Sequence, residues 1–304
     1  MPSNQSEQAL LRVRDLKVHF RTDDGILHAV DGVDLHINRG ETLGVVGESG
    51  CGKSVTAMTI MKLLAMPPGF IAGGEILFEG RDLVKATNAE MRTIRSREIA
   101  MIFQEPMTSL NPVLTIGFQI AEPLSVHLGL KGQALQAKVA ELLTQVGIPS
   151  DRANAYPDEL SGGQRQRVMI AMSIACRPAM LIADEPTTAL DVTVQAQILR
   201  LLDDLKHEMN MGMLLITHDF GVVADVADHV VVMFRGEIVE QGPVATVLNK
   251  PKHPYTKALL ACVPDAEGKK QLKPMDYSWL ESETLKSSTT KKPKTKAKTA
   301  GVLA

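Results

Sequence analysis

The sequence predicts an α/β fold with a mostly parallel sheet, an N-terminal antiparallel β region and an inserted helical subdomain. Short apolar runs typical of buried strands recur at residues 42–46, 99–103 and 213–217. Segments with helical spacing of apolar residues separate these runs, and strands that alternate with helices form parallel sheets. A glycine-rich stretch follows the first run, at the end of a strand where ligands of such sheets collect.

Composition narrows the class of protein. A chain of 304 residues with 44% hydrophobic residues is large enough for one large or two ordinary domains. The 33 basic and 35 acidic residues nearly cancel, so we expect no nucleic-acid partner. Cys51, Cys176 and Cys262 lack C-x-x-C spacing, which argues against a zinc site or disulfide framework. Because the N-terminus is polar and no long apolar run follows, we expect that the protein is not exported and does not span a membrane by itself.

The first part of the chain is predicted to be antiparallel. Apolar and polar residues alternate over 10–20 and again over 30–37, with a turn at Asp23-Asp24-Gly25 between them. A further short strand is expected over 74–80. Phe20 lies at the end of the first run, where its ring could stack on a nucleobase or pack as an ordinary strand aromatic. The pattern alone leaves both readings of Phe20 open.

The glycine-rich stretch has the form of a phosphate-binding loop. Residues 47–54 read GESGCGKS, a G-x-x-x-x-G-K-S motif between a strand and a helix expected over 55–64. Glycines let backbone N–H groups approach phosphate oxygens, and the helix N-terminus adds partial positive charge. We expect Lys53 to reach the β- and γ-phosphates and Ser54 to bind Mg²⁺ through its hydroxyl. Taken alone, the motif also fits a glycine-rich turn that binds nothing.

Polar residues also lie at the ends of further predicted elements. Gln104 ends the strand run at 99–103, and Ser161 is a good N-cap for the apolar helix that begins at Gly162 and Gly163. The N-terminus of that helix would be a second place where backbone N–H groups can bind an anion, in addition to the helix that follows the phosphate-binding loop.

Asp184 and Glu185 end a buried run that begins at Met180, and we expect their side chains to point in opposite directions along the strand. His218 follows the run at 213–217, where the alternative is a core histidine at a strand end. Because the carboxyl ends of parallel strands share one edge, the loop, both carboxylates and His218 should meet.

The C-terminal part changes character. A hairpin is expected around Arg235-Gly236, and a short helix should follow Pro251 and end near Cys262. The Lys-rich end of the chain predicts disorder, with weak contact to anionic lipid as the alternative. The predicted division is a core of 9–87 and 166–247, a helical subdomain of 88–165, an extension of 248–266 and a polar tail of 267–304.

These motifs together resemble one family. The loop, LSGGQRQR at 160–167, LIADEP at 181–186 and His218 are similar to the nucleotide-binding subunits of ABC transporters, over about residues 10–265. The resemblance implies a P-loop NTPase core. QEPMTSLNP from Gln104, DEPTTALDVTVQAQIL from Asp184 and HPYTKALL from His253 resemble the D-type ATPase subunits of oligopeptide, dipeptide and nickel importers. Members of that group commonly carry cysteines in a C-terminal segment, but none follows Cys262 here, so we expect no iron–sulfur cluster.

The resemblance implies the cofactors ATP and Mg²⁺ and a role for each motif. Glu185 would act as general base on the attacking water, and His218 would contact the γ-phosphate. Asp184 would hold Mg²⁺ with Ser54, and Gln104 would complete the shell around the ion and the water. Asp191 would bridge to the site of a partner subunit.

The expected ATP-binding residues are Phe20, Gly47, Glu48, Ser49, Gly50, Cys51, Gly52, Lys53, Ser54 and Val55. The expected signature residues, which would face the partner's ATP, are Ser161, Gly162, Gly163 and Gln164.

The resemblance also implies an assembly. Two ATP molecules would lie between this chain and a second ATPase subunit, for which the resemblance favours a related chain over a second copy. Closure would drive two membrane-spanning permease subunits, which an extracytoplasmic solute-binding protein supplies with substrate. The complex would sit at the cytoplasmic face of the bacterial inner membrane and import peptides. A nickel or other small-solute importer, a non-transport ABC ATPase and a module that binds ATP without hydrolysis are the alternatives. Specificity in such importers lies in other subunits, so the sequence does not define the cargo.

Overall fold

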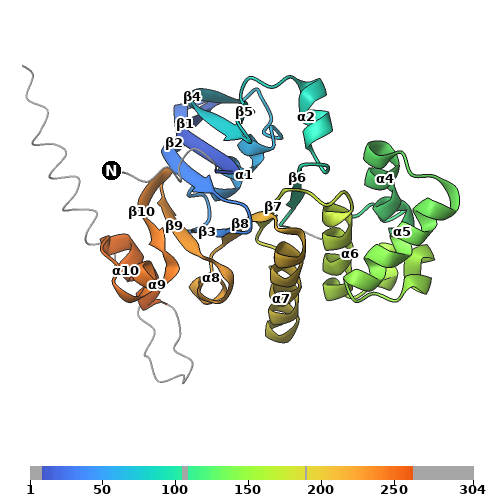
Figure 1. The fold of residues 1–304 in the computed structure, drawn as a ribbon. Coiled ribbons are helices and arrows are strands. Elements are labelled where there is room, and N and C mark those ends of the chain that lie inside the picture. Colours follow the sequence, from blue (N-terminus) through green and yellow to red (C-terminus); the bar gives the residue numbers. More distant parts are fainter. Residues whose placement is uncertain (1–8, 105–108, 189, 263–304) are drawn as a thin grey trace, which may run out of the picture.

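Two β-sheets organise the part of the chain that the computed structural model describes, residues 9–104, 109–188 and 190–262 (Figure 1). One sheet has four antiparallel strands in the order β2-β1-β4-β5, and the other has six strands in the order β10-β9-β3-β8-β7-β6. The predicted α/β fold with an N-terminal antiparallel region is confirmed.

The N-terminal sheet matches the predicted hairpin but extends further. Its strands are β1 (Leu11–Thr22), β2 (Gly25–Ile37), β4 (Gly69–Phe78) and β5 (Arg81–Asp82). The turn lies at Asp23-Asp24, since Thr22 pairs with Gly25. β4 begins earlier than predicted because Gly74 is a bulge within the strand, not its start. Gly74 has φ +91°, and a Cβ there would lie 2.4 Å from the carbonyl oxygen of Asp15.

The six-stranded sheet carries the predicted buried runs. Its strands are β3 (Thr42–Val46), β6 (Ile99–Ile102), β7 (Met180–Asp184), β8 (Gly212–Thr217), β9 (His229–Phe234) and β10 (Glu237–Pro243). All pairs are parallel except β9 with β10. Val46 pairs with Thr217, and Asp184 pairs with Ile216. The carboxyl ends of β3, β8 and β7 therefore lie at one edge, next to that of β6.

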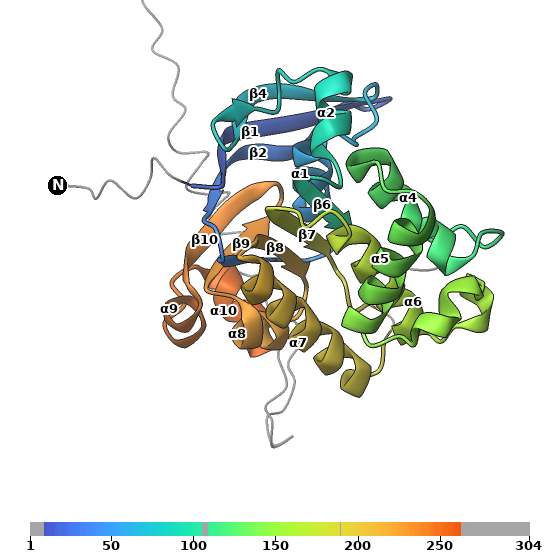
Figure 2. The ribbon, with the colours of Figure 1, turned by 45° about the vertical axis from the view of Figure 1, so that its right-hand side comes forward.

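Helices flank this sheet, and some of them form a separate helical layer on one side of it. They are α1 (Lys53–Ile60), α2 (Asn88–Ile94), α4 (Ile116–Leu128), α5 (Gly132–Gln145), α6 (Gly162–Ile174), α7 (Val192–Met209), α8 (Phe220–Val226), α9 (Val244–Asn249) and α10 (Pro254–Ala261), with 3-10 turns η2 (Ser150–Asn154) and η3 (Pro157–Glu159). In both ribbon views α4 and α5 lie beside α6, on the side opposite to α9 and α10 (Figures 1 and 2).

Two boundaries of the predicted helical subdomain, 88–165, need correction. β6 lies inside that range, yet it pairs with β7 and belongs to the central sheet. The boundary at residue 165 would cut α6, which runs unbroken from the Ser161 N-cap. Helix α6 is continuous and packs with α4 and α5 in one buried apolar cluster, to which β6, β7 and α7 also contribute. We therefore propose that the helical subdomain runs from α4 to α6.

The predicted C-terminal extension, 248–266, is described only as far as Cys262, and its boundary at residue 248 falls inside α9. α10 starts after His253, its N-cap, and ends at Ala261. The predicted disordered tail, 267–304, and the end of the extension, 263–266, lie outside the described residues. Within the described part, no helix combines the length and the apolar character needed to cross a membrane.

Candidate functional site

The phosphate-binding loop connects β3 to α1 and depends on two glycines. Gly47 has φ +156° and Gly52, the N-cap of α1, has φ +104°. A Cβ at Gly47 would lie 2.3 Å from the carbonyl oxygen of Met233, and one at Gly52 would lie 2.5 Å from that of Ala29. Both are backbone atoms that cannot move independently. The loop can therefore adopt this conformation only with glycine at these positions.

We expect Gly52→Ala to destabilise the protein more than Gly50→Ala. Both residues have positive φ, which costs an alanine about 1–2 kcal/mol. Only Gly52 has a backbone oxygen in the space of the new Cβ, whereas no atom lies within 4 Å at Gly50. Urea unfolding of both variants would measure the difference. Equal losses of unfolding free energy would contradict the steric argument.

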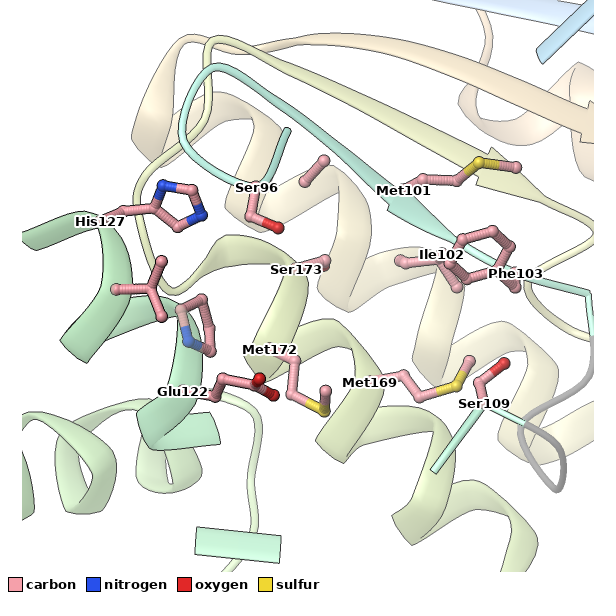
Figure 3. A pocket seen from close by; sticks show the side chains of 13 residues that line it. Ser96, Met101, Ile102, Phe103, Ser109, Glu122, His127, Met169, Met172 and Ser173 are labelled. Carbon is pink, nitrogen blue, oxygen red and sulfur yellow. The ribbon is translucent and has the colours of Figure 1, made fainter. Parts of the chain in front are cut away.

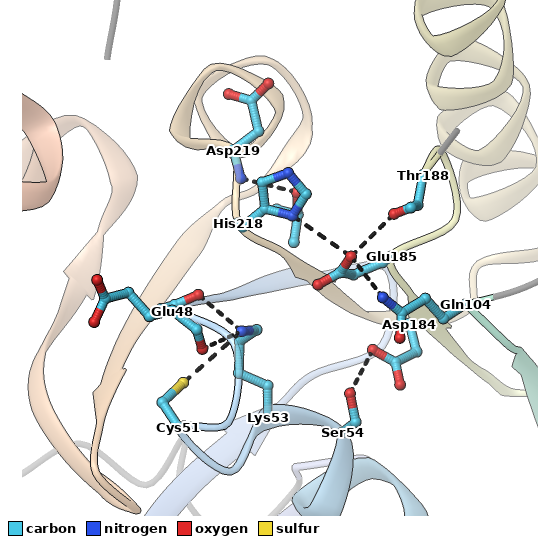
Figure 4. Close-up of polar contacts among 12 residues, drawn as sticks. Glu48, Cys51, Lys53, Ser54, Gln104, Asp184, Glu185, Thr188, His218 and Asp219 are labelled. Atoms are coloured by element: carbon cyan, nitrogen blue, oxygen red, sulfur yellow. Dashed lines mark hydrogen bonds and ion pairs between the residues drawn. The ribbon is translucent and has the colours of Figure 1, made fainter. Parts of the chain in front are cut away.

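Lys53 lies folded over the loop (Figure 4). Its side chain is buried, and Nζ donates to the carbonyl oxygens of Gly47 at 2.8 Å and Glu48 at 2.9 Å. The Cys51 Sγ lies 3.8 Å from the same ammonium. Burial raises the pKa of the Cys51 thiol although the charge of Lys53 opposes this. The loop thus holds a neutral thiol and a cation whose carbonyl partners can be exchanged for phosphate oxygens.

Ser54 and Asp184 form a pair of oxygen ligands beside the loop. The Ser54 hydroxyl, at the start of α1, donates to Asp184 Oδ1 at 3.1 Å, and Asp184 ends β7. Burial raises the pKa of Asp184; the Ser54 hydrogen bond opposes the shift and the charge of Glu185 adds to it. Mg²⁺ prefers such oxygen ligands, and a cation would offset the cost of burying the carboxylate. The two side chains therefore fit the predicted metal site.

Glu185 is the centre of a group of polar side chains (Figure 4). Its Oε2 accepts hydrogen bonds from Gln104 Nε2 at 3.0 Å and Thr188 Oγ1 at 2.9 Å. His218 Nδ1 lies 3.5 Å from the same oxygen. Gln104 and His218 come from the ends of β6 and β8, as the parallel sheet predicts.

The geometry of Glu185 corrects one prediction. Glu185 does not alternate with Asp184 along a strand, because β7 ends at Asp184 and Glu185 has φ +47°. Its backbone N–H still bonds to the carbonyl oxygen of Ile216 at 2.9 Å. From this position after the strand, its carboxylate reaches Gln104, which follows β6, and His218, which follows β8.

A cavity of about 130 Å³ lies beside the phosphate-binding loop and is called the loop hollow below. It brings together part of the predicted site, since its lining consists of Ala29, Ser49, Gly50, Gly52, Lys53, Ser54, Val55, Gln104 and Glu185. Gly47 instead lies against Met233 of β9, and the carbonyl oxygen of Cys51 accepts from the N–H of Gly236 in the turn between β9 and β10. The sequence did not predict that Ala29 lines this cavity. It also did not predict the hydrogen bond from Thr188 to Glu185, for which the sequence signal was a hydroxyl residue three positions after the carboxylate.

Phe20 is half-buried and packs against the apolar cluster between the N-terminal sheet and α1. A Cβ on Gly69 would lie 3.2 Å from its ring. This packing is the one expected of an ordinary aromatic residue in a strand. Stacking of the Phe20 ring on adenine stays a prediction.

Ser161 and Asp191 both cap helices away from the lining of the loop hollow. Ser161 Oγ accepts from the Gln164 N–H at 3.3 Å, and Gln164 Oε1 accepts from the Ser161 N–H at 3.0 Å, which is a capping box at α6. Gly162 and Gly163 form the first turn of α6. Asp191 Oδ1 accepts from the Val194 N–H at 2.9 Å at the start of α7. Neither Ser161 nor Asp191 lines the loop hollow of this chain.

A second group of metal-type side chains lies on the N-terminal sheet. His19, His28 and Asp31 have potential ligand atoms within 4.8 Å of one another. The two imidazole rings are stacked, 4.0 Å apart and 18° from parallel. Because near-parallel rings do not aim their nitrogen lone pairs at a common point, we assign no metal there.

Comparison with known proteins decides the family. The ABC transporter family profile matches residues 30–188, and the profile of the oligopeptide/dipeptide transporter C-terminal region matches residues 239–286. The chain belongs to the ABC transporter family. The oligopeptide transport ATP-binding protein OppD of Bacillus subtilis is 54% identical over 85% of this chain and 73% of its own length. A probable peptide ABC transporter ATP-binding protein of Sinorhizobium fredii is 52% identical over 87% of this chain and 80% of its own length.

Solved structures of ABC cassettes share the fold. A dimeric ATP-binding cassette in a post-hydrolysis state with ADP and Pi has a TM-score of 0.70 and 28% identity, over 77% of this chain and 98% of that chain. The cbiO1 protein of Clostridium perfringens, part of an ABC transporter complex, has a TM-score of 0.69 and 27% identity, over 80% of this chain and 92% of that chain. The prediction of an ATP-hydrolysing ABC subunit is confirmed.

Proposed function

We propose that this chain is the ATP-hydrolysing subunit of an importer of peptides. The arrangement of Glu185 carries the hydrolytic part of the proposal, because three polar side chains orient its carboxylate beside the phosphate loop. The peptide part is supported by relatives named for oligopeptide and peptide import. The glutathione import ATP-binding protein GsiA of Salmonella typhimurium is also 52% identical over 262 residues, and this chain spans 42% of it. Short peptides are the substrate class common to these names.

Different residues at the loop are proposed to bind the phosphates, hold Mg²⁺ and accept the proton of the attacking water. Lys53 would exchange its carbonyl partners for phosphate oxygens, and loop N–H groups would bind the remaining ones. Mg²⁺, held by Ser54, Asp184 and Gln104, would neutralise charge on the phosphates. Glu185 would accept the proton of the attacking water, and His218 would donate a hydrogen bond to the γ-phosphate.

Further residues of the site are proposed to come from a second ATPase subunit. Ser161, at the exposed N-terminus of α6, would present its hydroxyl and the N–H groups of Gly162 and Gly163 to the partner's ATP. Gln164 would orient Ser161 through the two hydrogen bonds of the capping box. Asp191 would lie next to the same interface. The similar cassette with ADP and Pi is dimeric, which supports this arrangement. We propose a related chain as the partner.

A groove between β6, α4 and α6 is proposed to receive a membrane subunit (Figure 3). About 330 Å³ in volume, it is lined by the apolar side chains of Met101, Phe103 and Met172 among others, with Glu122 and His127 contributed by α4. Flexible methionines adapt to an inserted apolar side chain. A cytoplasmic helix of a permease subunit has the amphipathic chemistry that fits. Such docking would hold the chain at the cytoplasmic face of the inner membrane, with a solute-binding protein on the other side.

Uptake in cells tests the proposed substrate class. We expect a strain without this chain to lose uptake of a labelled oligopeptide, and the intact gene to restore it while the Glu185→Gln gene does not. Labelled glutathione and ⁶³Ni²⁺ are the parallel substrates. Unchanged peptide uptake with lost Ni²⁺ uptake would refute peptide import but keep the ATPase. Co-purification of the tagged chain from detergent extracts should recover two permease subunits and a related ATPase.

A further inference from the structure

The phosphate loop is also held from behind by the C-terminal part of the chain. The backbone N–H of Glu48 donates to the hydroxyl oxygen of Tyr255, in α10, at 3.0 Å. The backbone N–H of Gly236, in the turn between β9 and β10, donates to the carbonyl oxygen of Cys51 at 3.0 Å. Two segments that lie about 200 residues after the loop in the sequence therefore support it, one at Glu48 and one at Cys51.

The position of Tyr255 is fixed by its surroundings. The residue is fully buried, and its ring centroid lies 4.4 Å from that of Phe234. Its backbone N–H donates to Nδ1 of His253, the N-cap of α10, at 3.1 Å. The N–H groups of Lys252 and His253 donate to the Glu240 carboxylate at 2.8 and 3.0 Å. Because ring and helix start are both anchored, the hydroxyl has little freedom to follow a moving loop.

One peptide group joins Tyr255 to the phosphate-binding lysine. The Gly47 carbonyl and the Glu48 N–H belong to the same planar peptide unit. Its oxygen accepts from Lys53 Nζ at 2.8 Å, and its N–H donates to Tyr255. Rotation of this peptide plane would break both hydrogen bonds. Hydrogen bonds in series through a peptide also polarise one another.

We propose that Tyr255 is a positioning residue for nucleotide binding. Its hydroxyl fixes the Gly47–Glu48 peptide, and that peptide fixes the place from which Lys53 moves to the phosphates. The Glu48 N–H is committed to Tyr255, so the phosphates are bound by the other N–H groups of the loop. Tyr255 itself does not touch the nucleotide. The inference rests on the proposed ATP binding at this loop and adds that α10 and the nucleotide are energetically coupled.

Tyr255→Phe tests the coupling by removal of one oxygen atom while the ring against Phe234 remains. Loss of one hydrogen bond that orders the loop should raise the dissociation constant of a fluorescent ATP analogue about three- to tenfold. In the assembled transporter, KM for ATP should rise more than kcat falls. The matched control is Leu259→Ala, since Leu259 packs α10 against its apolar cluster without a bond to the loop. The control should lower Tm and leave the dissociation constant unchanged.

The outcomes separate the two proposals. If the wild-type chain binds no ATP analogue, the proposed function fails. If the wild type binds and Tyr255→Phe binds equally well, or Leu259→Ala weakens binding as much, the positioning role fails.

Hydrogen exchange of the wild-type chain provides a test that does not depend on a variant folding. Coupling between two sites is reciprocal, so ATP should slow amide exchange in α10. Exchange in α5, on the other side of the molecule, should stay the same (Figure 1). Protection of the loop by ATP without any change in α10 would overturn the inference.

Discussion

Glu185→Gln is expected to lower ATP hydrolysis by about 10²- to 10⁴-fold while ATP binding is retained. Glutamine has nearly the same shape, and its side-chain oxygen can still accept from Gln104 and Thr188, whose donors lie 3.0 and 2.9 Å from Oε2. It cannot accept a proton from water at neutral pH. Phosphate release by the assembled transporter and titration with a fluorescent ATP analogue measure the two properties separately.

Glu141→Gln is the matched control for this experiment. Glu141 lies on α5, is largely exposed and pairs with Lys138 at 2.7 Å. The same loss of one negative charge there should leave hydrolysis unchanged. Hydrolysis by Glu185→Gln at the wild-type rate would remove Glu185 as general base, and Asp184 would then need to be tested in the same way.

The elements with strong local signals were predictable from sequence. β3, β7 and β8 are continuous apolar runs, because strands covered on both faces need no polar residues. The Ser161 cap and the phosphate loop are recognisable because each depends on a few consecutive residues. The meeting of the phosphate loop, Glu185 and His218 followed from one rule about the ends of parallel strands.

Features that depend on tertiary contacts were not predictable in the same way. Period-two alternation placed Glu185 opposite to Asp184, but the strand ends between them and Glu185 takes a left-handed conformation. β6 was grouped with helices since its partner strand, β7, lies about 80 residues further along the chain. The bond between Tyr255 and Glu48 joins residues 207 positions apart, and no local pattern marks it.

Lys53→Ala is expected to weaken ATP binding about ten- to hundredfold, the effect of losing charged hydrogen bonds to phosphate. The lysine is already buried at the loop and bound only to exchangeable carbonyl oxygens and a thiol in the contacts described, so its cation is in place before the nucleotide arrives. Removal of that cation leaves the loop N–H groups as the remaining attraction for phosphate. Fluorescent-ATP titration at fixed ionic strength measures the change.

Lys62→Ala separates the loss of this cation from a general loss of stability. Lys62 follows α1 at its other end and donates to the carbonyl oxygens of Val84, at 3.0 Å, and Ala86. Both variants lose a lysine that bonds to backbone carbonyls, and both should unfold more easily. Only Lys53→Ala should lose nucleotide affinity, since only Lys53 lies at the loop hollow. Equal dissociation constants for Lys53→Ala and the wild type would show that the phosphates bind elsewhere than the G-x-x-x-x-G-K-S loop.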